Sequence, residues 1–215
     1  HHTVAYNIGM TAQHSAHHSG HSFGIDVGGS GIKGAEVDLA TGEFVGDRLK
    51  IATPQPATPE AVAEVVAQIV SEKCWDGPVG ITMPSVVKDQ VMLSAANIDK
   101  SWIGVDAQEL FSQHLDVPFT VLNDADAAGL AEVAYGDEIA RTGSVLFLTL
   151  GTGIGSALLL DGHLFPNTEL GHLTVDKKEA EKQASSAVKD REELKTKQWA
   201  KRVNRVLHEY EALLN

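Results

Sequence analysis

Two glycine-rich loops, each lying between two strand-like segments, limit the fold of this chain more than any other feature. The first, GIDVGGSGIKG, joins apolar patterns at 22–27 and 32–39, and the second, LTLGTGIGSA, joins 145–150 and 156–160. A dinucleotide-binding G-x-G-x-x-G must open a helix, and a strand follows here, so that fold is rejected. The P-loop pattern G-x-x-x-x-G-K-[ST] is also absent. The repeated strand, glycine turn and strand predict two α/β halves of similar plan.

The predicted organisation is a tail and two domains. Residues 1–22 are rich in His, Ser and Gly and are expected to be a disordered tail or tag. An N-terminal α/β domain is expected over 23–124 and a C-terminal α/β domain over 125–215. The chain ends directly after a helical pattern where a strand would normally follow, so the second domain is predicted to be incomplete. The patterns predict strands at 44–51, 79–83, 86–93 and 119–122, and helices at 59–70, 106–114, 125–135, 178–188 and 199–214.

Composition excludes several functional classes. The net charge of −12 argues against general nucleic-acid binding. No apolar run reaches the ~20 residues of a membrane helix, so no membrane contact is expected. Residues 1–22 lack the pattern of a signal peptide, and a single cysteine, Cys74, fits a reducing compartment. We therefore expect a cytoplasmic protein.

Charge is unevenly spread along the chain. Residues 177–205 hold ten Lys or Arg and five Asp or Glu, whereas the remainder is strongly acidic. A segment of this kind is usually a solvated helix surface, but it can also guide a polyanionic substrate. Both interpretations stay open from the sequence.

Both glycine loops can hold phosphate, because backbone N–H groups approach oxygen atoms closely where no Cβ intervenes. In the first loop Ser30 adds a hydroxyl and Lys33 a cation, and Asp26 is placed to orient a hydrated Mg²⁺. The alternative is a tight hairpin with a satisfied carboxylate. Two such loops predict a cleft with phosphate-binding backbone from both halves. The candidate phosphate-binding residues are Asp26, Gly28, Gly29, Ser30, Lys33, Gly151, Thr152, Gly153 and Gly155.

A carboxylate suited to proton transfer lies between the two loops in sequence. Asp124, in NDAD, sits where a predicted strand ends and a helix begins, the usual place for a site in an open α/β sheet. Phosphoryl transfer to a hydroxyl needs a carboxylate that accepts the hydroxyl proton. The alternative role is a helix N-cap, for which Asn123 and Asp126 compete. Three polar residues at one cap exceed what capping requires.

Other polar residues suit sugar hydroxyls. Glu169 and His172, in NTELGH, follow a proline, and Asn97 lies in AANIDKSW. Acid, imidazole and amide groups can exchange hydrogen bonds with hydroxyls, although such residues are more often plain surface loop. Trp102 is expected in the core rather than as a platform for a sugar.

These motifs together resemble the ROK family of sugar kinases, within the actin-like, hexokinase-like fold, and its polyphosphate-using actinobacterial branch. The strings are FGIDVGGSGIKG, TPQPATP, AANIDKSWIG, VLNDADAAGLAE, LTLGTGIGSA and PNTELGHL. The resemblance implies phosphoryl transfer from inorganic polyphosphate, with ATP as a further donor, to the 6-hydroxyl of glucose, with Mg²⁺ and as a homodimer. It makes Asp124 the general base and Asn97, Asn123, Glu169 and His172 the sugar ligands. It also makes the glycine loops the phosphate sites.

The chain departs from the family pattern in three places. A cysteine-rich zinc motif is absent after His172, so no structural zinc is expected. Ser85 stands where the family has glycine, which puts the local backbone in doubt. The segment that receives adenosine in the family lies beyond Asn215, so ATP use is left open. A strictly ATP-dependent hexokinase and a sugar-binding regulatory relative without catalysis remain alternatives.

Overall fold

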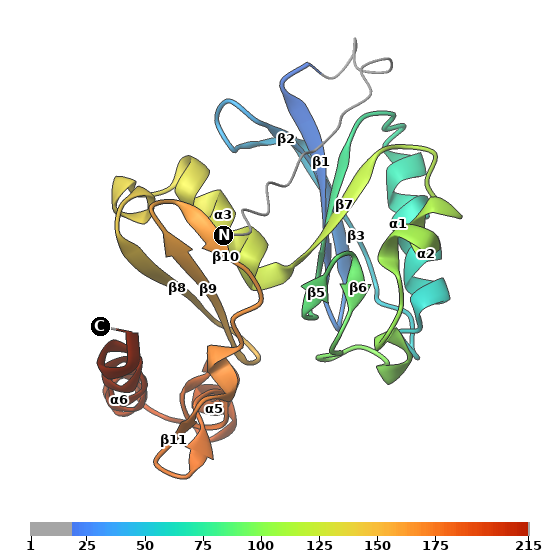
Figure 1. The fold of residues 1–215 in the computed structure, drawn as a ribbon. Coiled ribbons are helices and arrows are strands. Elements are labelled where there is room, and N and C mark those ends of the chain that lie inside the picture. Colours follow the sequence, from blue (N-terminus) through green and yellow to red (C-terminus); the bar gives the residue numbers. More distant parts are fainter. Residues whose placement is uncertain (1–18, 215) are drawn as a thin grey trace.

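The computed structural model describes residues 19–214, which form two lobes (Figure 1). The first lobe is built on a five-stranded mixed sheet in the order β3-β2-β1-β4-β7, in which β1 to β3 form an antiparallel meander and β1, β4 and β7 run parallel. Its strands are β1 (His21–Val27), β2 (Ile32–Asp38), β3 (Phe44–Ile51), β4 (Val79–Met83) and β7 (Phe119–Asn123).

Helices α1 (Pro59–Glu72) and α2 (Ala107–Ser112) lie over one face of this sheet (Figure 1). The Thr58 side chain caps α1 by accepting the Ala61 N–H, as a Thr-Pro-Glu start predicts. The short 3-10 helix η1 (Lys100–Trp102) brings Trp102 into the core, where it is fully buried and donates to the Ala57 carbonyl at 2.9 Å. The expectation that this tryptophan is a core residue is confirmed.

The continuous strand expected at 86–93 is wrong. The segment is a two-stranded hairpin of β5 (Val87–Lys88) and β6 (Val91–Met92). Asp89 and Gln90 turn the chain with φ of 51° and 65°. The Gln90 side chain then donates to the Val121 carbonyl and accepts its N–H, which fixes the hairpin to β7.

The second lobe begins with α3 (Asp124–Tyr135), which follows β7 directly. The 3-10 helix η2 (Glu138–Arg141) leads into a three-stranded antiparallel sheet of β8 (Ser144–Leu150), β9 (Ile154–Leu160) and β10 (His163–Phe165). Helix α3 packs so closely on β9 that a Cβ at Gly129 would come within 2.6 Å of the Ala157 Cβ.

The last part of the chain differs most from expectation. It contains η3 (Leu170–His172), β11 (Thr174–Val175), β12 (Lys178–Glu179), α4 (Glu181–Ala184), α5 (Ser186–Arg191) and α6 (Thr196–Leu214). The single helix expected at 178–188 is wrong, because Ser185 leaves the helical conformation and caps α5 by accepting the Val188 N–H. Helix α6 starts three residues earlier than expected.

The mixed α/β class and the repeated hairpins around glycine loops are confirmed. The junction of β7 and α3 falls between Asn123 and Asp124, and the division of the chain into domains at 124 stays a prediction. Strand β1 already begins at His21, inside the segment assigned to the tail, and most of that segment lies outside the described residues. Within residues 19–214, no helix has the length and apolarity required to cross a membrane.

Candidate active site

A cleft of about 590 Å³ lies between the two lobes, where the two glycine loops meet the start of α3 and the η3 segment. Most of the residues singled out in the sequence line it together, although they come from distant parts of the chain. They are Asp26, Gly28, Gly29, Asn97, Asn123, Asp124, Gly151, Thr152, Gly153, Gly155, Glu169 and His172.

Asp124 is the first residue of α3 and is exposed to the cleft. Its Oδ1 accepts the Ala125 N–H at 2.8 Å, which holds the carboxylate in place. The surrounding walls desolvate the carboxylate and raise its pKa, and the nearby negative charge of Asp26 raises it further. The cleft thus presents an oriented carboxylate that is more basic than usual.

Asn123, not Asp124, is the N-cap of α3. Its Oδ1 accepts the N–H groups of Ala125 and Asp126 at 2.9 and 3.0 Å. Its Nδ2 donates to the Ser85 carbonyl at 3.0 Å, and the residue is 8% exposed. The amide therefore fixes the start of α3 against the end of β4, and Asp124 is left free of the capping role.

Ser85 occupies its position without backbone strain. It is not among the described residues with positive φ, and its hydroxyl donates to the Ser94 carbonyl at 2.6 Å. The buried side chain ties the strand end to the loop before Asn97. The serine is thus compatible with the local geometry, and it lines the cleft together with Ser94.

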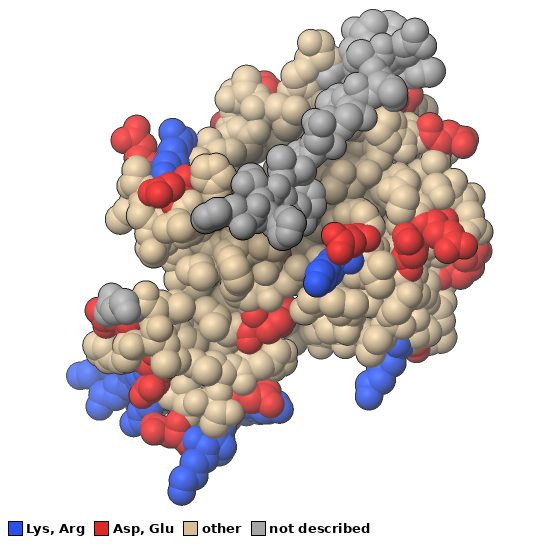
Figure 2. All heavy atoms as spheres, viewed as in Figure 1, with Lys and Arg blue, Asp and Glu red and all other residues tan. Residues whose placement is uncertain are grey.

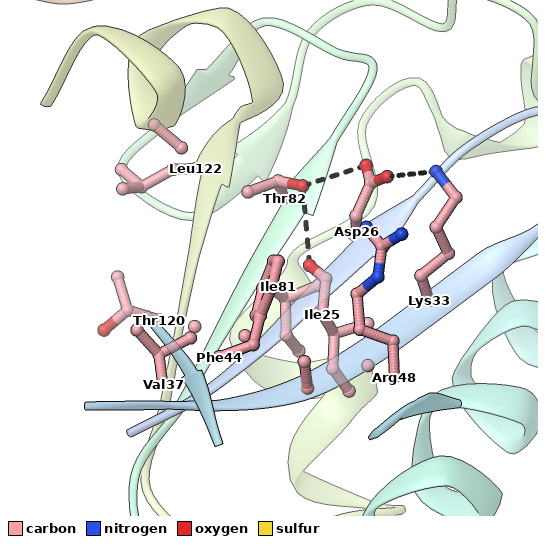
Figure 3. Close-up of a pocket in the computed structure, with 15 residues that line it drawn as sticks. Ile25, Asp26, Lys33, Val37, Phe44, Arg48, Ile81, Thr82, Thr120 and Leu122 are labelled. Atoms are coloured by element: carbon pink, nitrogen blue, oxygen red, sulfur yellow. Dashed lines mark hydrogen bonds and ion pairs between the residues drawn. The ribbon is translucent and has the colours of Figure 1, made fainter. Parts of the chain in front are cut away.

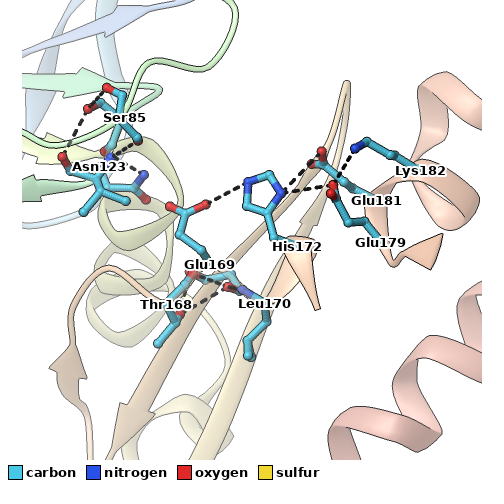
Figure 4. Close-up of polar contacts among 12 residues, drawn as sticks. Ser85, Asn123, Thr168, Glu169, Leu170, His172, Glu179, Glu181 and Lys182 are labelled. Carbon is cyan, nitrogen blue, oxygen red and sulfur yellow. Dashed lines mark hydrogen bonds and ion pairs between the residues drawn. The ribbon is translucent and has the colours of Figure 1, made fainter. Parts of the chain in front are cut away.

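Glu169 and His172 form a short polar chain with residues of the C-terminal segment (Figure 4). His172 Nε2 lies 3.6 Å from Glu169, while its Nδ1 lies 3.3 Å from Glu179 and 3.7 Å from Glu181. Burial is the main cause that raises the pKa of Glu169, opposed by His172 and reinforced by Asp124. The imidazole is thus held between carboxylates with one edge toward the cleft.

Two further polar residues at the cleft, Glu181 and Asn167, were not predicted from the sequence. Glu181 lines the cleft and crowds the second loop, because a Cβ at Gly153 would come within 2.5 Å of its carboxylate. Asn167 bonds across the lobes to Val87 and donates its N–H to Asp126 at 2.8 Å. The acidic pattern E-x-E after His172 was the available signal for Glu181, whereas no local pattern marks Asn167.

His172, Glu179 and Glu181 place their ligand atoms within 4.8 Å of one another. Lys182 already neutralises Glu179 at 2.9 Å, and hydrogen bonding to Lys182 and His172 lowers the pKa of Glu179. Internal ion pairs therefore account for the cluster. The expectation of no structural zinc stays a prediction.

The structure does not bring Ser30 or Lys33 into the lining of the cleft. Lys33 pairs with Asp26 at 2.9 Å and lines a separate hollow of about 430 Å³ on the open face of the large sheet (Figure 3). That hollow is mainly apolar, with Ile25, Ile81 and Leu122 among its walls. Asp26 lines both spaces and marks the wall between them.

Both glycine loops are tightly packed turns. A Cβ at Gly29 would lie 2.8 Å from the Asn97 carbonyl oxygen, and one at Gly155 would lie 2.9 Å from the Ala125 Cβ. The N–H groups of Gly29 and Thr152 donate to no other described residue of the protein. Backbone donors at both loops are therefore available to an anion in the cleft.

The ROK family profile matches residues 22–186. A polyphosphate glucokinase of Mycobacterium tuberculosis is 55% identical over 188 residues, which cover 87% of this chain and 71% of the relative.

Two crystal structures share the fold. An inorganic polyphosphate/ATP-glucomannokinase from Arthrobacter sp. strain KM superposes with a TM-score of 0.84 at 46% identity, covering 90% of this chain and 79% of the other. A ROK family glucokinase from Streptomyces griseus, in complex with glucose and AMPPNP, gives a TM-score of 0.69 at 29% identity, covering 80% and 59%. These matches confirm the expected actin-like, hexokinase-like fold, and the chain belongs to the ROK family.

Proposed function

We propose that this protein transfers a phosphoryl group from inorganic polyphosphate to the 6-hydroxyl of glucose. The observation that carries the proposal is the position of Asp124, an oriented carboxylate with a raised pKa in a cleft lined by both glycine loops. The similarity to a polyphosphate glucokinase and to a polyphosphate/ATP-glucomannokinase supports polyphosphate as donor and a hexose as acceptor. ATP is included as a second donor on the same ground.

In this proposal Asp124 accepts the proton of the glucose 6-hydroxyl while the hydroxyl oxygen attacks the terminal phosphorus. The bond from that phosphorus to the bridging oxygen breaks, and the shortened polyphosphate leaves with the electron pair. A raised pKa makes the carboxylate a better proton acceptor. The Ala125 N–H keeps the accepting carboxylate oriented.

Glucose is held by the polar groups around Asp124. In the cleft, the second lobe contributes Glu169 and His172 and the first lobe contributes Asn97. Asn123 contributes by fixing the start of α3, since its amide is already engaged with Ala125, Asp126 and Ser85. The phosphates lie along the two glycine loops, where the N–H groups of Gly29 and Thr152 are free to donate, whereas those of Gly28 and Gly151 already donate to Gly31 and Gly153.

The residues present fit a hydrated magnesium ion. Asp26 and Asp124 line one cleft and are close enough for the charge of Asp26 to raise the pKa of Asp124. Carboxylate oxygens of this kind are the ligands that Mg²⁺ prefers, with waters completing its shell. When bound, the ion would neutralise charge on the phosphate oxygens. The proposal further includes a cytoplasmic location and a homodimer.

The test is glucose 6-phosphate formation by the purified chain with polyphosphate and, separately, with ATP. Asp124→Asn should lower kcat by about 10²- to 10⁴-fold, the usual contribution of a general base, while glucose still binds. Asp116→Asn is the matched control, because Asp116 is an exposed aspartate remote from the cleft lining. Absence of turnover with polyphosphate in the parent protein would sink the proposal, and turnover with ATP alone would support the ATP-dependent alternative.

A further inference from the structure

The distribution of charged residues along α6 destabilises the helix. From Thr196 to Arg205 the helix carries four basic residues and no acidic one, and its acidic residues, Glu209 and Glu211, follow in the second half. The N-terminus of a helix favours negative charge and its C-terminus positive charge. Helix α6 has the reverse polarity.

The basic residues of α6 also repel one another. Lys197, Lys201 and Arg205 are spaced at i, i+4 and i+8, so they share one side of the helix, where like charges are unfavourable. Arg205 is ion-paired with Asp176 at 3.0 Å, which leaves the repulsion between Lys197 and Lys201 uncompensated. Val206 and Tyr210, which are buried, occupy the other side. The side of α6 that carries Lys197, Lys201 and Arg205 therefore faces away from the core.

Several lysines of this region have no acidic partner within residues 19–214. Among the described residues, no ion pair is recorded for Lys195, Lys197 or Lys201, and all three are exposed. Lys189 lies 5.4 Å from the centre of the Trp199 ring. We call Lys189, Lys195, Lys197 and Lys201 the lysine track. Figure 2 shows that Lys and Arg gather over the C-terminal elements, while the charged residues visible elsewhere are mostly Asp and Glu.

The lysine track is connected directly to the second glycine loop. Ser186 Oγ and the Ala187 N–H both donate to the Gly151 carbonyl, at 2.9 and 3.2 Å, so α5 starts on the loop. With a rise of 1.5 Å per residue, α5 spans only about 9 Å before the chain turns toward Lys195. A chain of phosphates that leaves the cleft past Gly151 therefore comes within reach of the lysine track over the short length of α5.

The other end of this region is fixed to the active site as well. Trp199 Nε1 donates to the Ala184 carbonyl at 2.8 Å, and the Tyr210 hydroxyl donates to the Leu170 carbonyl at 2.7 Å. Burial raises the pKa of Tyr210 to about 12, so its hydroxyl stays a donor. Helix α6 is thus held in a fixed position relative to the loop that carries Glu169 and His172.

We infer that the lysine track binds the distal part of long-chain inorganic polyphosphate while its terminal phosphate lies in the cleft. The inference rests on the proposed function. It adds the path that the polyphosphate chain takes outside the active site. A polyanion bound along the track would neutralise the positive charges of Lys197 and Lys201. It would thereby relieve both their mutual repulsion and their unfavourable position in the N-terminal half of α6. Continuity with the phosphate loop favours polyphosphate over nucleic acid.

The test compares donors of different length in a double variant, Lys197→Gln with Lys201→Gln, which removes two charges and keeps a similar helix propensity. The KM for long-chain polyphosphate should rise about three- to tenfold, as expected from loss of two exposed charge contacts. The slope of log KM for long-chain polyphosphate against log salt concentration should decrease by about two, one for each lysine removed. The KM for tripolyphosphate, the KM for glucose and kcat should stay unchanged.

The matched control is Lys88→Gln with Lys100→Gln, which removes the same charge from exposed lysines of the first lobe. It should leave the KM for long-chain polyphosphate unchanged. Equal changes for long and short donors in the Lys197/Lys201 variant, or equal effects of the two double variants, would overturn the inference. So would single-stranded nucleic acid that competes with the long donor as strongly as free polyphosphate does.

Equilibrium binding of long-chain polyphosphate separates this inference from the proposed function. If the parent protein binds the polymer and the Lys197/Lys201 variant binds it more weakly, the track is supported even where turnover fails. If the parent protein turns over polyphosphate and both proteins bind the long polymer equally, the function stands and the track is wrong.

Discussion

The Asn167 side chain pairs with the Val87 backbone in both directions. Its Oδ1 accepts the Val87 N–H at 2.9 Å, and its Nδ2 donates to the Val87 carbonyl at 2.8 Å. Asn167 belongs to the loop that precedes Glu169, and Val87 starts β5 of the other lobe. The amide thereby forms a clamp between the lobes on one side of the cleft.

Asn167→Ala should lower the free energy of unfolding by about 1–3 kcal/mol, because two partly buried hydrogen bonds between lobes are lost. The KM for glucose should rise as well, since the loop carrying Glu169 loses its anchor. Urea unfolding and glucose titration measure the two effects. Asn167 has φ of 61°, so Asn167→Gly serves as the control that removes the clamp without side-chain strain. Unchanged stability and KM in both variants would show that the clamp is unimportant.

Asp124→Asn should stabilise the protein at neutral pH although it strongly lowers kcat. The pKa of Asp124 is raised in the folded state, so the ionised carboxylate is less favourable there than in the unfolded chain. The variant's advantage should be full above the raised folded pKa. It should shrink as pH falls and vanish below about 3.8, the ordinary value, where the carboxyl is protonated in both states.

Unfolding by urea at neutral pH and near pH 4 checks the sign of this effect. Asp116→Asn provides the comparison, as an exposed aspartate outside the cleft. In the parent enzyme, turnover should also fall as pH drops through the raised pKa, because a protonated Asp124 cannot accept the hydroxyl proton. A variant less stable than the parent at neutral pH would contradict the assigned desolvation.

Gly29→Ala should weaken glucose binding through Asn97. The added Cβ would lie 2.8 Å from the Asn97 carbonyl oxygen and 3.1 Å from its Cβ, so the loop or Asn97 must move. We expect a loss of about 1–3 kcal/mol in stability and a raised KM for glucose. Gly80→Ala is the control, because a Cβ there meets no atom within 4 Å. Equal behaviour of the two alanine variants would disprove the steric argument.

Trp102→Phe should affect stability without affecting sugar binding. The change removes the hydrogen bond to Ala57 and part of a fully buried ring, which together cost about 1–3 kcal/mol. Thermal unfolding should report the loss, while the KM for glucose stays within twofold. A large rise in KM at unchanged stability would instead place the ring at the sugar.

The sequence predicted the parts of the cleft better than the details of their contacts. Glycine spacing, the strand that follows each loop and the NDAD junction are local features, and they identified both loops and Asp124. The role of Asn123 depends on a bond to Ser85, 38 positions away, and the position of Lys33 depends on which sheet face it occupies. Neither is visible in local patterns.

Some secondary structure was also beyond local patterns. The helix expected at 178–188 had a plausible apolar spacing, but Ser185 offers the backbone a competing cap and divides it. The strand expected at 86–93 is interrupted because Gln90 finds both of its partners on Val121. In each case a specific side-chain hydrogen bond outweighs the periodic pattern.

The direct continuation of β7 into α3 has a mechanical consequence. Helix α3 is tied to the first lobe at its start, through Asn123 and Ser85, and is packed into the second lobe further along, where Gly129 meets Ala157. When two bodies turn about such a joint, points on the axis are displaced least. Asp124 lies on that joint, so opening or closing of the lobes would swing both glycine loops through an arc and leave the proton acceptor almost stationary.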